Sequence, residues 1–131
     1  MSSEAKPRIL VIDDDPALQK LVSTLLERSG MSVMTATNAT EAAQILKARP
    51  LPDAIVLDLM LPDISGIEFL RQMRQREAYQ ELPVLILSAL ADPEKIREGL
   101  SVGADRYLTK PYLGNNLVPT MQDLLRTGRK K

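Results

Sequence analysis

The chain has 131 residues, of which 44% are hydrophobic, and its 17 basic and 17 acidic residues cancel to no net charge. This length and composition predict one domain with a closed apolar core, and the balanced charge gives no general attraction to nucleic acid or anionic lipid. Because the sequence contains neither cysteine nor histidine, disulfides, thiol catalysis, zinc sites built from these residues and histidine-based catalysis are excluded.

Three stretches of the chain differ in character. Residues 1–7 are polar, end in Pro7 and lack the apolar core of a signal peptide, so we predict a flexible lead-in. Residues 8–126 carry the apolar pattern of a domain, and residues 127–131 are predicted to be a basic tail. No apolar run approaches the roughly 20 residues of a membrane helix, so we expect a cytoplasmic protein without membrane contact.

The domain begins with a strand, an acidic loop and a helix. Residues 9–12 form an apolar run rich in β-branched side chains, which is typical of a buried parallel strand. Three acids follow at positions 13–15, and Asp15 before Pro16 has the order of a helix N-cap and first helical residue. Apolar residues then recur at helical spacing as far as Gly30.

The same order recurs along the rest of the chain. Further strands are predicted at residues 32–35, 54–57, 83–88 and 106–109. The remaining helices are predicted to begin at Asn38, with Glu41 in capping-box spacing; at Gly66, ending near Arg76; at Asp92-Pro93, with Ile96 and Leu100 on one face; and at Asn115-Asn116, with Pro119 in the first turn.

Five strands alternating with five helices predict an α/β fold with parallel pairing, because each connection between strands is a helix. The expected architecture is a doubly wound, five-stranded parallel sheet of the flavodoxin-like type, with strand order 2-1-3-4-5. In such a sheet, ligands bind outside the carboxyl ends of strands 1 and 3, where the strand order reverses. Asp13 and Asp14 follow strand 1 and Asp58 follows strand 3, so we expect the three carboxylates to lie together.

Three carboxylates at one sheet edge would repel each other unless a cation lay among them. Oxygen ligands without histidine or cysteine favour Mg²⁺, Mn²⁺ or Ca²⁺. The alternative role for each acid is a helix cap, and for Asp15 we favour that alternative. Ser88 ends the fourth strand and Lys110 ends the fifth, so a hydroxyl and an ammonium group are expected near Asp58.

Together these residues resemble the receiver domain of two-component response regulators, a CheY-like family, over residues 8–126. The matching positions are the acidic pair Asp13-Asp14, the segment from Leu57 to Pro62 that contains Asp58, the following Gly66, Ser88 before Ala89, and the segment from Tyr107 to Pro111 that contains Lys110. Each motif alone is weak. Their occurrence in this order at successive strand ends is specific.

The resemblance implies a phosphoprotein. Asp58 would take a phosphoryl group from a phosphohistidine of a sensor histidine kinase or a phosphotransfer protein, forming an aspartyl phosphate. Asp14, Asp58 and the backbone carbonyl of Met60 would bind Mg²⁺, with Mn²⁺ as a substitute, and Asp13 would reach the metal through water. Such a domain is a signalling module and not an enzyme, apart from catalysing its own phosphorylation and slow dephosphorylation.

The resemblance also assigns a conformational switch. Ser88 would bond a phosphoryl oxygen, Lys110 would pair with the phosphate, and Tyr107 would turn inward in response; the simpler reading of Tyr107 is a half-buried edge-strand tyrosine. The change would control a downstream protein partner or an attached output domain, as in a phosphorelay, with no direct nucleic acid binding by the domain. Residues 112–119 depart from the family pattern, which leaves open a phosphorylation-dependent homodimer through the last two helices.

Three other readings compete with a phosphorylated receiver. A phosphatase of the haloacid dehalogenase type needs a second acid two residues after its nucleophile, and Met60 occupies that place. A flavin-binding flavodoxin needs a hydroxyl- and glycine-rich loop after strand 1, where this chain has three acids. A degenerate receiver that acts only as a protein docking module is the remaining alternative, and the intact motif positions argue against it.

Overall fold

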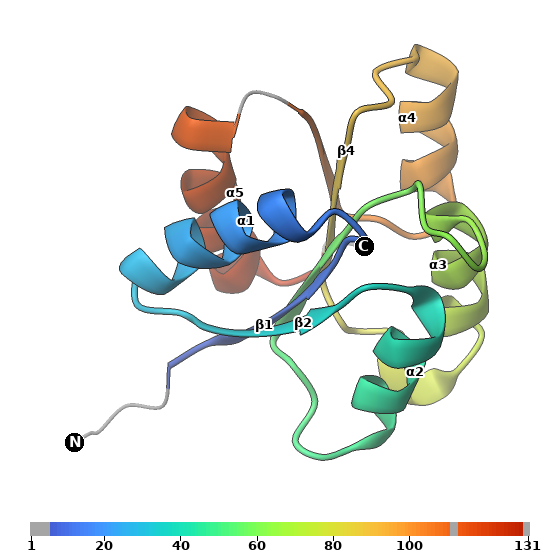
Figure 1. Cartoon of the computed structure of the whole chain (residues 1–131). Helices are drawn as coiled ribbons and strands as arrows, with labels where there is room; N and C mark the ends of the chain where they lie inside the picture. Colours follow the sequence, from blue (N-terminus) through green and yellow to red (C-terminus); the bar gives the residue numbers. More distant parts are fainter. Residues whose placement is uncertain (1–5, 111–112, 130–131) are drawn as a thin grey trace.

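The computed structural model describes residues 6–110 and 113–129, and in this part of the chain five parallel strands form one sheet in the order β2-β1-β3-β4-β5 (Figure 1). The strands are β1 (Arg8–Ile12), β2 (Ser32–Ala36), β3 (Ala54–Leu57), β4 (Val84–Ser88) and β5 (Arg106–Thr109). The helices are α1 (Pro16–Arg28), α2 (Ala39–Lys47), α3 (Gly66–Arg74), α4 (Pro93–Ser101) and α5 (Leu113–Thr127). The predicted fold class and strand order are confirmed.

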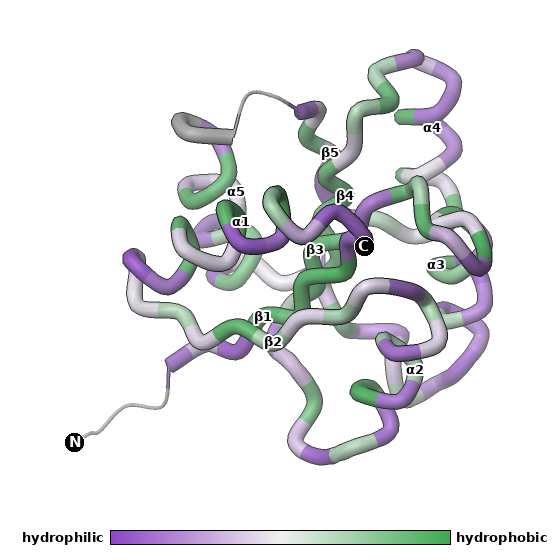
Figure 2. Tube along the Cα trace, in the orientation of Figure 1, coloured by the Kyte–Doolittle hydropathy of each residue, from purple (hydrophilic) through white to green (hydrophobic). Residues whose placement is uncertain are grey.

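The central strands are mostly apolar, and their alternate side chains point to opposite sides of the sheet. Both faces of the sheet are therefore apolar. Hydropathy mapped on the chain shows the central strands as mostly hydrophobic segments inside a more hydrophilic exterior (Figure 2). One face carries Leu10, Ile12, Ile55, Leu57, Val84 and Ile86, and the other carries Ile9, Val11, Ala54, Val56, Leu85 and Leu87. The sheet is therefore a buried central layer that needs helices on both sides.

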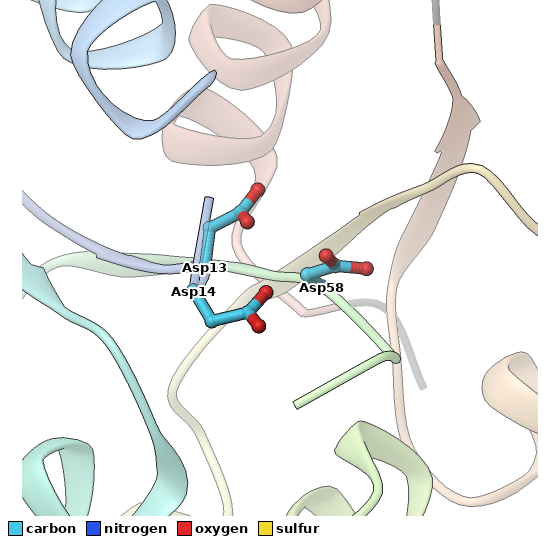
Figure 3. Close-up of side chains that lie close together, drawn as sticks. All are labelled: Asp13, Asp14 and Asp58. Carbon is cyan, nitrogen blue, oxygen red and sulfur yellow. The ribbon is translucent and has the colours of Figure 1, made fainter. Parts of the chain in front are cut away.

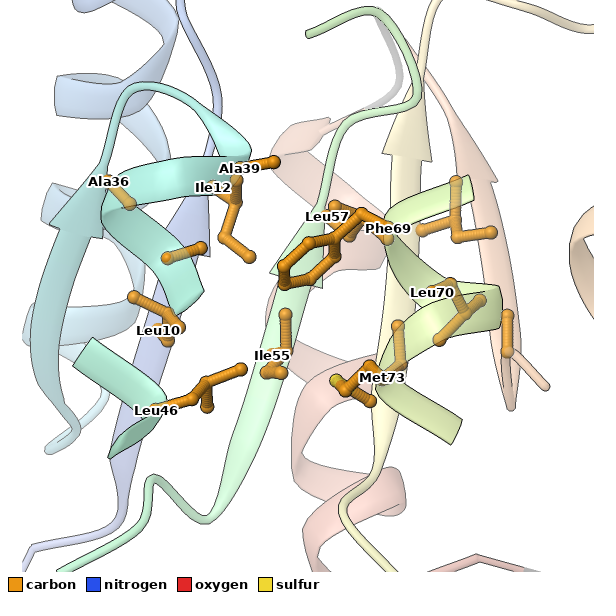
Figure 4. Packing of buried hydrophobic residues seen from close by; sticks show 14 of the residues in the cluster. Leu10, Ile12, Ala36, Ala39, Leu46, Ile55, Leu57, Phe69, Leu70 and Met73 are labelled. Atoms are coloured by element: carbon orange, nitrogen blue, oxygen red, sulfur yellow. The ribbon is translucent and has the colours of Figure 1, made fainter. Parts of the chain in front are cut away.

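Two groups of helices supply that cover. Helices α1 and α5 lie on one side of the sheet, and α2, α3 and α4 lie on the other (Figure 1). The α2 and α3 side is packed by Leu46 from α2 and by Phe69, Leu70 and Met73 from α3, as the close view of the core shows (Figure 4). This layering leaves the carboxyl ends of the strands uncovered by helix faces.

The predicted helix starts are largely confirmed. Side-chain oxygens of Asp15, Asn38 and Asp92 each accept a backbone N–H from the first turn of α1, α2 and α4. Glu41 does not complete the expected capping box, because its carboxylate accepts the backbone N–H of Thr37 at 2.8 Å. The cap therefore extends one residue further upstream than the sequence pattern indicates.

The start of α5 was predicted wrongly. The helix begins at Leu113, so Pro119 lies in its second turn and not in its first. A proline there removes one intrahelical hydrogen bond and strains the preceding turn. Packing offsets this cost, since Leu117, Met121 and Leu124 of the same helix are completely buried against the sheet.

Two further details differ from the expectation. Helix α3 ends at Arg74, and a short 3₁₀ turn, Glu77–Tyr79, follows it where no element was predicted. Leu100 in α4 was expected on one face together with Ile96, and this residue is 43% exposed. The buried residue of α4 is Gly99, because Ile86 and the ring of Tyr107 come so close to this helix that they leave little room for a side chain.

The two ends of the described chain are attached to the sheet. Of the predicted lead-in, only Lys6 and Pro7 are described, and the carbonyl of Pro7 accepts the N–H of Ser32 at 2.8 Å. Of the predicted tail, Arg129 donates to the carboxylate of Asp105 at 2.9 Å, while residues 130–131 lie outside the described residues. None of the helices that the structure describes is long and apolar enough to cross a bilayer.

Candidate functional site

Asp13, Asp14 and Asp58 form an acidic cluster at the carboxyl edge of the sheet. One carboxylate oxygen from each of them lies within 4.8 Å of the others (Figure 3). Asp13 and Asp58 are only 4% and 5% exposed, whereas Asp14 is exposed to solvent. Of the described chain, this is the one group of acids placed closely enough to hold a cation.

The strand register brings these acids together. Strands β1 and β3 are neighbours, and Ile12 pairs with Leu57 at their carboxyl ends. The backbone N–H of Asp58 donates to the carbonyl of Ile12 at 3.0 Å, and the N–H of Asp13 donates to the carbonyl of Ala36 in β2 at 3.0 Å. The sheet hydrogen bonds therefore continue up to the acidic residues and hold their backbones firmly.

Lys110 brings a cation to the two buried acids. Its Nζ lies 3.2 Å from Oδ2 of Asp13 and 3.2 Å from Oδ2 of Asp58. Burial raises the pKa of Asp13, although the N–H of Asp15 and the charge of Lys110 oppose this rise. One ammonium group offsets only part of the charge of the three carboxylates, so the ionised cluster keeps negative charge that favours a second cation.

Ser88 supplies a hydroxyl to the same carboxylate. Its Oγ donates to Oδ1 of Asp58 at 3.1 Å, and the residue is fully buried at the end of β4. Next to it, the hydroxyl of Tyr107 donates to the backbone carbonyl of Leu90 at 2.6 Å. Burial raises the pKa of Tyr107 above its ordinary value, so this hydroxyl remains a donor at neutral pH.

The loop after β3 frames the remaining side of Asp58. The backbone N–H of Met60 donates to Oδ1 of Asp58 at 3.2 Å, while the Met60 side chain is 57% exposed. Gly66 closes the loop, since its N–H donates to the carbonyl of Leu59 at 2.8 Å. A Cβ at this position would lie 2.7 Å from Cα of Leu59 and would collide with the carbonyl oxygen of Asp58. Only glycine permits this approach of α3 to the backbone of Asp58.

Two residues near the site were missed in the sequence. Gln19 of α1 donates from Nε2 to the carbonyls of Asp13, at 3.0 Å, and Ala36, at 3.1 Å. Asp63, in the loop after β3, accepts hydrogen bonds from the start of α2. No local pattern reveals Gln19, because its partners are backbone atoms of other elements; Asp63 directly follows a proline in a loop, which marks it as a capping candidate but does not indicate its partner.

Comparison with known protein families agrees with the assignment that the geometry of the site supports. A family model described as the response regulator receiver domain matches residues 9–122. The chain belongs to this family. Receiver domains of two-component response regulators are signalling domains, so the predicted resemblance and the predicted class of function are confirmed, and the degenerate alternative has no support.

Curated relatives include longer regulators. The chain is 42% identical over 120 residues to the DNA-binding dual master transcriptional regulator RpaA of Synechocystis sp., covering 92% of this chain and 49% of RpaA. It is also 42% identical over 120 residues to the transcriptional regulatory protein TrcR of Mycobacterium tuberculosis, covering 91% of this chain and 45% of TrcR. The chain therefore spans about half the length of the curated relatives that it matches.

Solved receiver structures are similar over almost the whole chain. A putative response regulator from Chloroflexus aurantiacus has a TM-score of 0.88 and 31% identity, and the match covers 93% of this chain and 99% of that one. The chemotaxis protein CheY4 of Vibrio cholerae has a TM-score of 0.82 and 36% identity, with 91% and 98% covered. The fold and the family are thus supported by both sequence and structure.

Proposed function

We propose that this chain accepts a phosphoryl group on Asp58 from a phosphohistidine of a sensor histidine kinase or a phosphotransfer protein. The observation that carries the proposal is the set of contacts around one buried carboxylate. Asp58 receives the hydroxyl of Ser88 on one oxygen and the ammonium group of Lys110 on the other. Membership of the receiver family supports the same assignment.

The donor set around Asp58 fits Mg²⁺, with Mn²⁺ as a substitute. All of the candidate ligand atoms are oxygens, which these hard cations prefer. Asp14, Asp58 and the backbone carbonyl of Met60 would hold the metal directly, and Asp13 would contribute through water. When bound, Mg²⁺ screens the negative charge of the incoming phosphoryl oxygens.

Asp58, Lys110 and Ser88 have different roles in the phosphoryl transfer. A carboxylate oxygen of Asp58 forms a bond to phosphorus while the bond between phosphorus and the donor's histidine nitrogen breaks, and that nitrogen keeps the electron pair. Lys110 compensates the charge of the phosphoryl oxygens, and Ser88 donates a hydrogen bond to one of them. The product is an acyl phosphate on Asp58, and catalysis is limited to this reaction and its slow hydrolysis.

Phosphorylation is coupled to the surface through Ser88 and Tyr107. Movement of Ser88 toward the phosphate shifts the loop that follows β4, where Leu90 accepts the hydroxyl of Tyr107. A change at Tyr107 then alters the exposed side of β5 and α4, which is read by a downstream partner or an attached output. We place this module at residues 8–126, in the cytoplasm, and leave nucleic acid contact to a separate output segment.

Mass spectrometry of the intact protein tests the proposal directly. Incubation with a small phosphodonor such as acetyl phosphate and Mg²⁺ should add one phosphoryl group to the wild type and none to Asp58→Asn, whose amide is not a nucleophile. Asp53→Asn is a matched control, because Asp53 is an exposed acid at the opposite end of β3. An unmodified wild type, or equal modification of Asp58→Asn, would contradict the assignment.

A further inference from the structure

The loop after β3 has a second attachment point at Asp63. Its Oδ1 accepts the backbone N–H of Ala39 at 3.0 Å and that of Ile64 at 3.0 Å. Its Oδ2 accepts the backbone N–H of Thr40 at 2.9 Å and the hydroxyl of Thr40 at 2.9 Å. The carboxylate thus takes four hydrogen bonds, and three of them come from the start of α2.

These bonds are of the strong kind. A carboxylate that accepts backbone N–H groups at a helix start gains from its full charge and from the positive end of the helix dipole. The pKa of Asp63 is accordingly held well below its usual value, chiefly by the N–H of Ala39. Asp63 is therefore ionised at any pH near neutrality and remains bonded to α2.

Helix α2 is a fixed support for this contact. Ala39, Ala42 and Leu46 are buried against the sheet, with exposed fractions of 5%, 0% and 2%. Because α2 is held by its packing, the bonds from Ala39 and Thr40 fix Asp63 relative to the sheet. The position of the loop is consequently set by a helix that contributes no residue to the acidic cluster.

The loop after β3 is also fixed at its other end, at Leu59. Gly66 donates to the carbonyl of Leu59, and no side chain fits between α3 and the backbone of Asp58. The segment from Met60 to Pro62 therefore runs between two attachments, one at Leu59 and one at Asp63. Only three residues separate these points, so the direction of the Met60 carbonyl depends on both.

We propose that Asp63 is a positioning residue for the loop after β3. By bonding this loop to the start of α2, Asp63 holds the backbone carbonyl of Met60 in the direction needed for metal binding. The inference rests on the proposed function, because it concerns the same metal position. It adds a coupling between α2 and the site that the acidic cluster alone does not provide. Asp63 touches neither the phosphoryl group nor the metal in this scheme.

The direct test is metal affinity in the unphosphorylated protein. Mg²⁺ is titrated into wild type and Asp63→Ala while the amide signals of Leu59 and Met60 are followed by NMR. Loss of groups that orient a metal ligand weakens affinity by about 10-fold or more, and we expect a loss of this order for Asp63→Ala. Thr40→Val, which removes one of the four bonds, should give a smaller loss in the same direction.

Asp53→Ala is the matched control. Asp53 also accepts a backbone N–H, that of Arg8 at 2.7 Å, but it lies at the opposite end of β3 from the acidic cluster. Its loss should leave Mg²⁺ affinity unchanged even if stability falls. If Asp63→Ala does not fold, Asp63→Asn and Thr40→Val carry the test, since each keeps part of the bonding.

The phosphorylation rate separates positioning from general damage. With acetyl phosphate as donor, Asp63→Ala should react slowly at low Mg²⁺ and approach the wild-type rate when Mg²⁺ is saturating. Unchanged Mg²⁺ affinity in a folded Asp63 variant, or an equal loss in Asp53→Ala, would overturn the inference. A wild type that binds Mg²⁺ but is never phosphorylated would overturn the proposed function instead, and the titrations would still decide the role of Asp63.

Discussion

The hydroxyl of Tyr107 donates to the backbone carbonyl of Leu90 at 2.6 Å and so joins β5 to the loop that leaves β4. The same loop begins at Ser88, whose hydroxyl bonds Asp58 and lies 3.4 Å from the N–H of Leu90. A continuous set of hydrogen bonds therefore runs from the buried carboxylate to a half-buried tyrosine at the surface. Four residues make up this set: Asp58, Ser88, Leu90 and Tyr107.

Tyr107→Phe should loosen this loop without disturbing the core. The variant keeps the ring and loses one hydrogen bond, which is worth about 0.5–1.5 kcal/mol of unfolding free energy. We expect a small decrease in stability by urea denaturation and faster amide hydrogen exchange at Leu90 and Ala91. Exchange rates equal to those of the wild type would show that the bond to Leu90 does not restrain the loop.

Asp14 should matter more than Asp15 for metal binding. Asp14 belongs to the acidic cluster, whereas the carboxylate of Asp15 is occupied by the N–H groups of Ala17 and Leu18 at the start of α1. Asp14→Ala is expected to abolish measurable Mg²⁺ binding, and Asp15→Ala to lower stability by about 1 kcal/mol through loss of the cap. NMR titration and thermal unfolding of both variants check the division; equal losses of affinity would refute it.

Lys110→Ala should make the protein depend on metal for stability. Removing the ammonium group leaves the buried carboxylates of Asp13 and Asp58 without a counter-charge, at a cost of about 1–3 kcal/mol. Saturating Mg²⁺ should restore most of this loss. The variant should still accept phosphoryl groups, but the amide signals of Tyr107 and Leu90 should not shift on phosphorylation. Wild-type shifts in the phosphorylated variant would assign Lys110 no part in the switch.

The phosphorylated form should be long-lived. Hydrolysis requires a water in line with phosphorus, and in the proposed phosphorylated form Met60 and Leu90, which lie two residues after Asp58 and Ser88, would flank this approach. Their apolar side chains cannot orient an attacking water, and Met60 stands at the rim with 57% exposure. Met60→Asn combined with Leu90→Glu should accelerate phosphate release by up to about 10²-fold. Phosphate loss measured on purified phosphoprotein checks this, and a double variant that decays no faster would remove the role of both side chains.

The contribution of Asp63 to the free energy of unfolding should decrease in acid. Its pKa is lowered from the ordinary 3.8, so the folded state binds this proton more weakly than the unfolded state does. The stabilisation is therefore complete above pH 3.8 and is lost as the pH falls further. Urea unfolding of wild type and Asp63→Ala at successive pH values should give a constant difference near neutrality that shrinks in acid. A difference that is the same at low pH would show that the charge of Asp63 contributes nothing.

The sequence was sufficient for those parts of the fold that depend on local chemistry. The central strands are continuous apolar runs, and Asp15-Pro16 and Asp92-Pro93 mark helix starts through bonds made within one turn. The start of α5 was misjudged because two asparagines look like caps and a proline usually lies near a helix start. Leu117 and Met121 are fully buried, and the local sequence pattern does not show how deep this burial is. Their burial overrides both signals.

The site was predictable to the extent that it follows from topology. Parallel strands present their carboxyl ends at one edge, so the sequence alone predicts that Asp13, Asp14 and Asp58 lie together. Gln19 and Asp63 were not foreseen, because each bonds backbone groups that lie 6 to 24 residues away in the chain. The sequence does not mark these backbone groups as hydrogen-bond partners. Backbone atoms are equivalent at every position, so only the three-dimensional structure shows which of them such a side chain reaches.

In the part of the chain that the structure describes, helix α4 buries fewer side chains than the other four helices. Its buried residue is Gly99, and in the described part of the chain none of its side chains enters either apolar core cluster. Native proteins open in cooperative units whose free energies range from almost zero up to that of global unfolding. We therefore expect α4 to detach at a lower free energy than the other helices, while the sheet stays folded. Such sub-global opening exposes Ile86 and the ring of Tyr107, which the helix otherwise covers at Gly99.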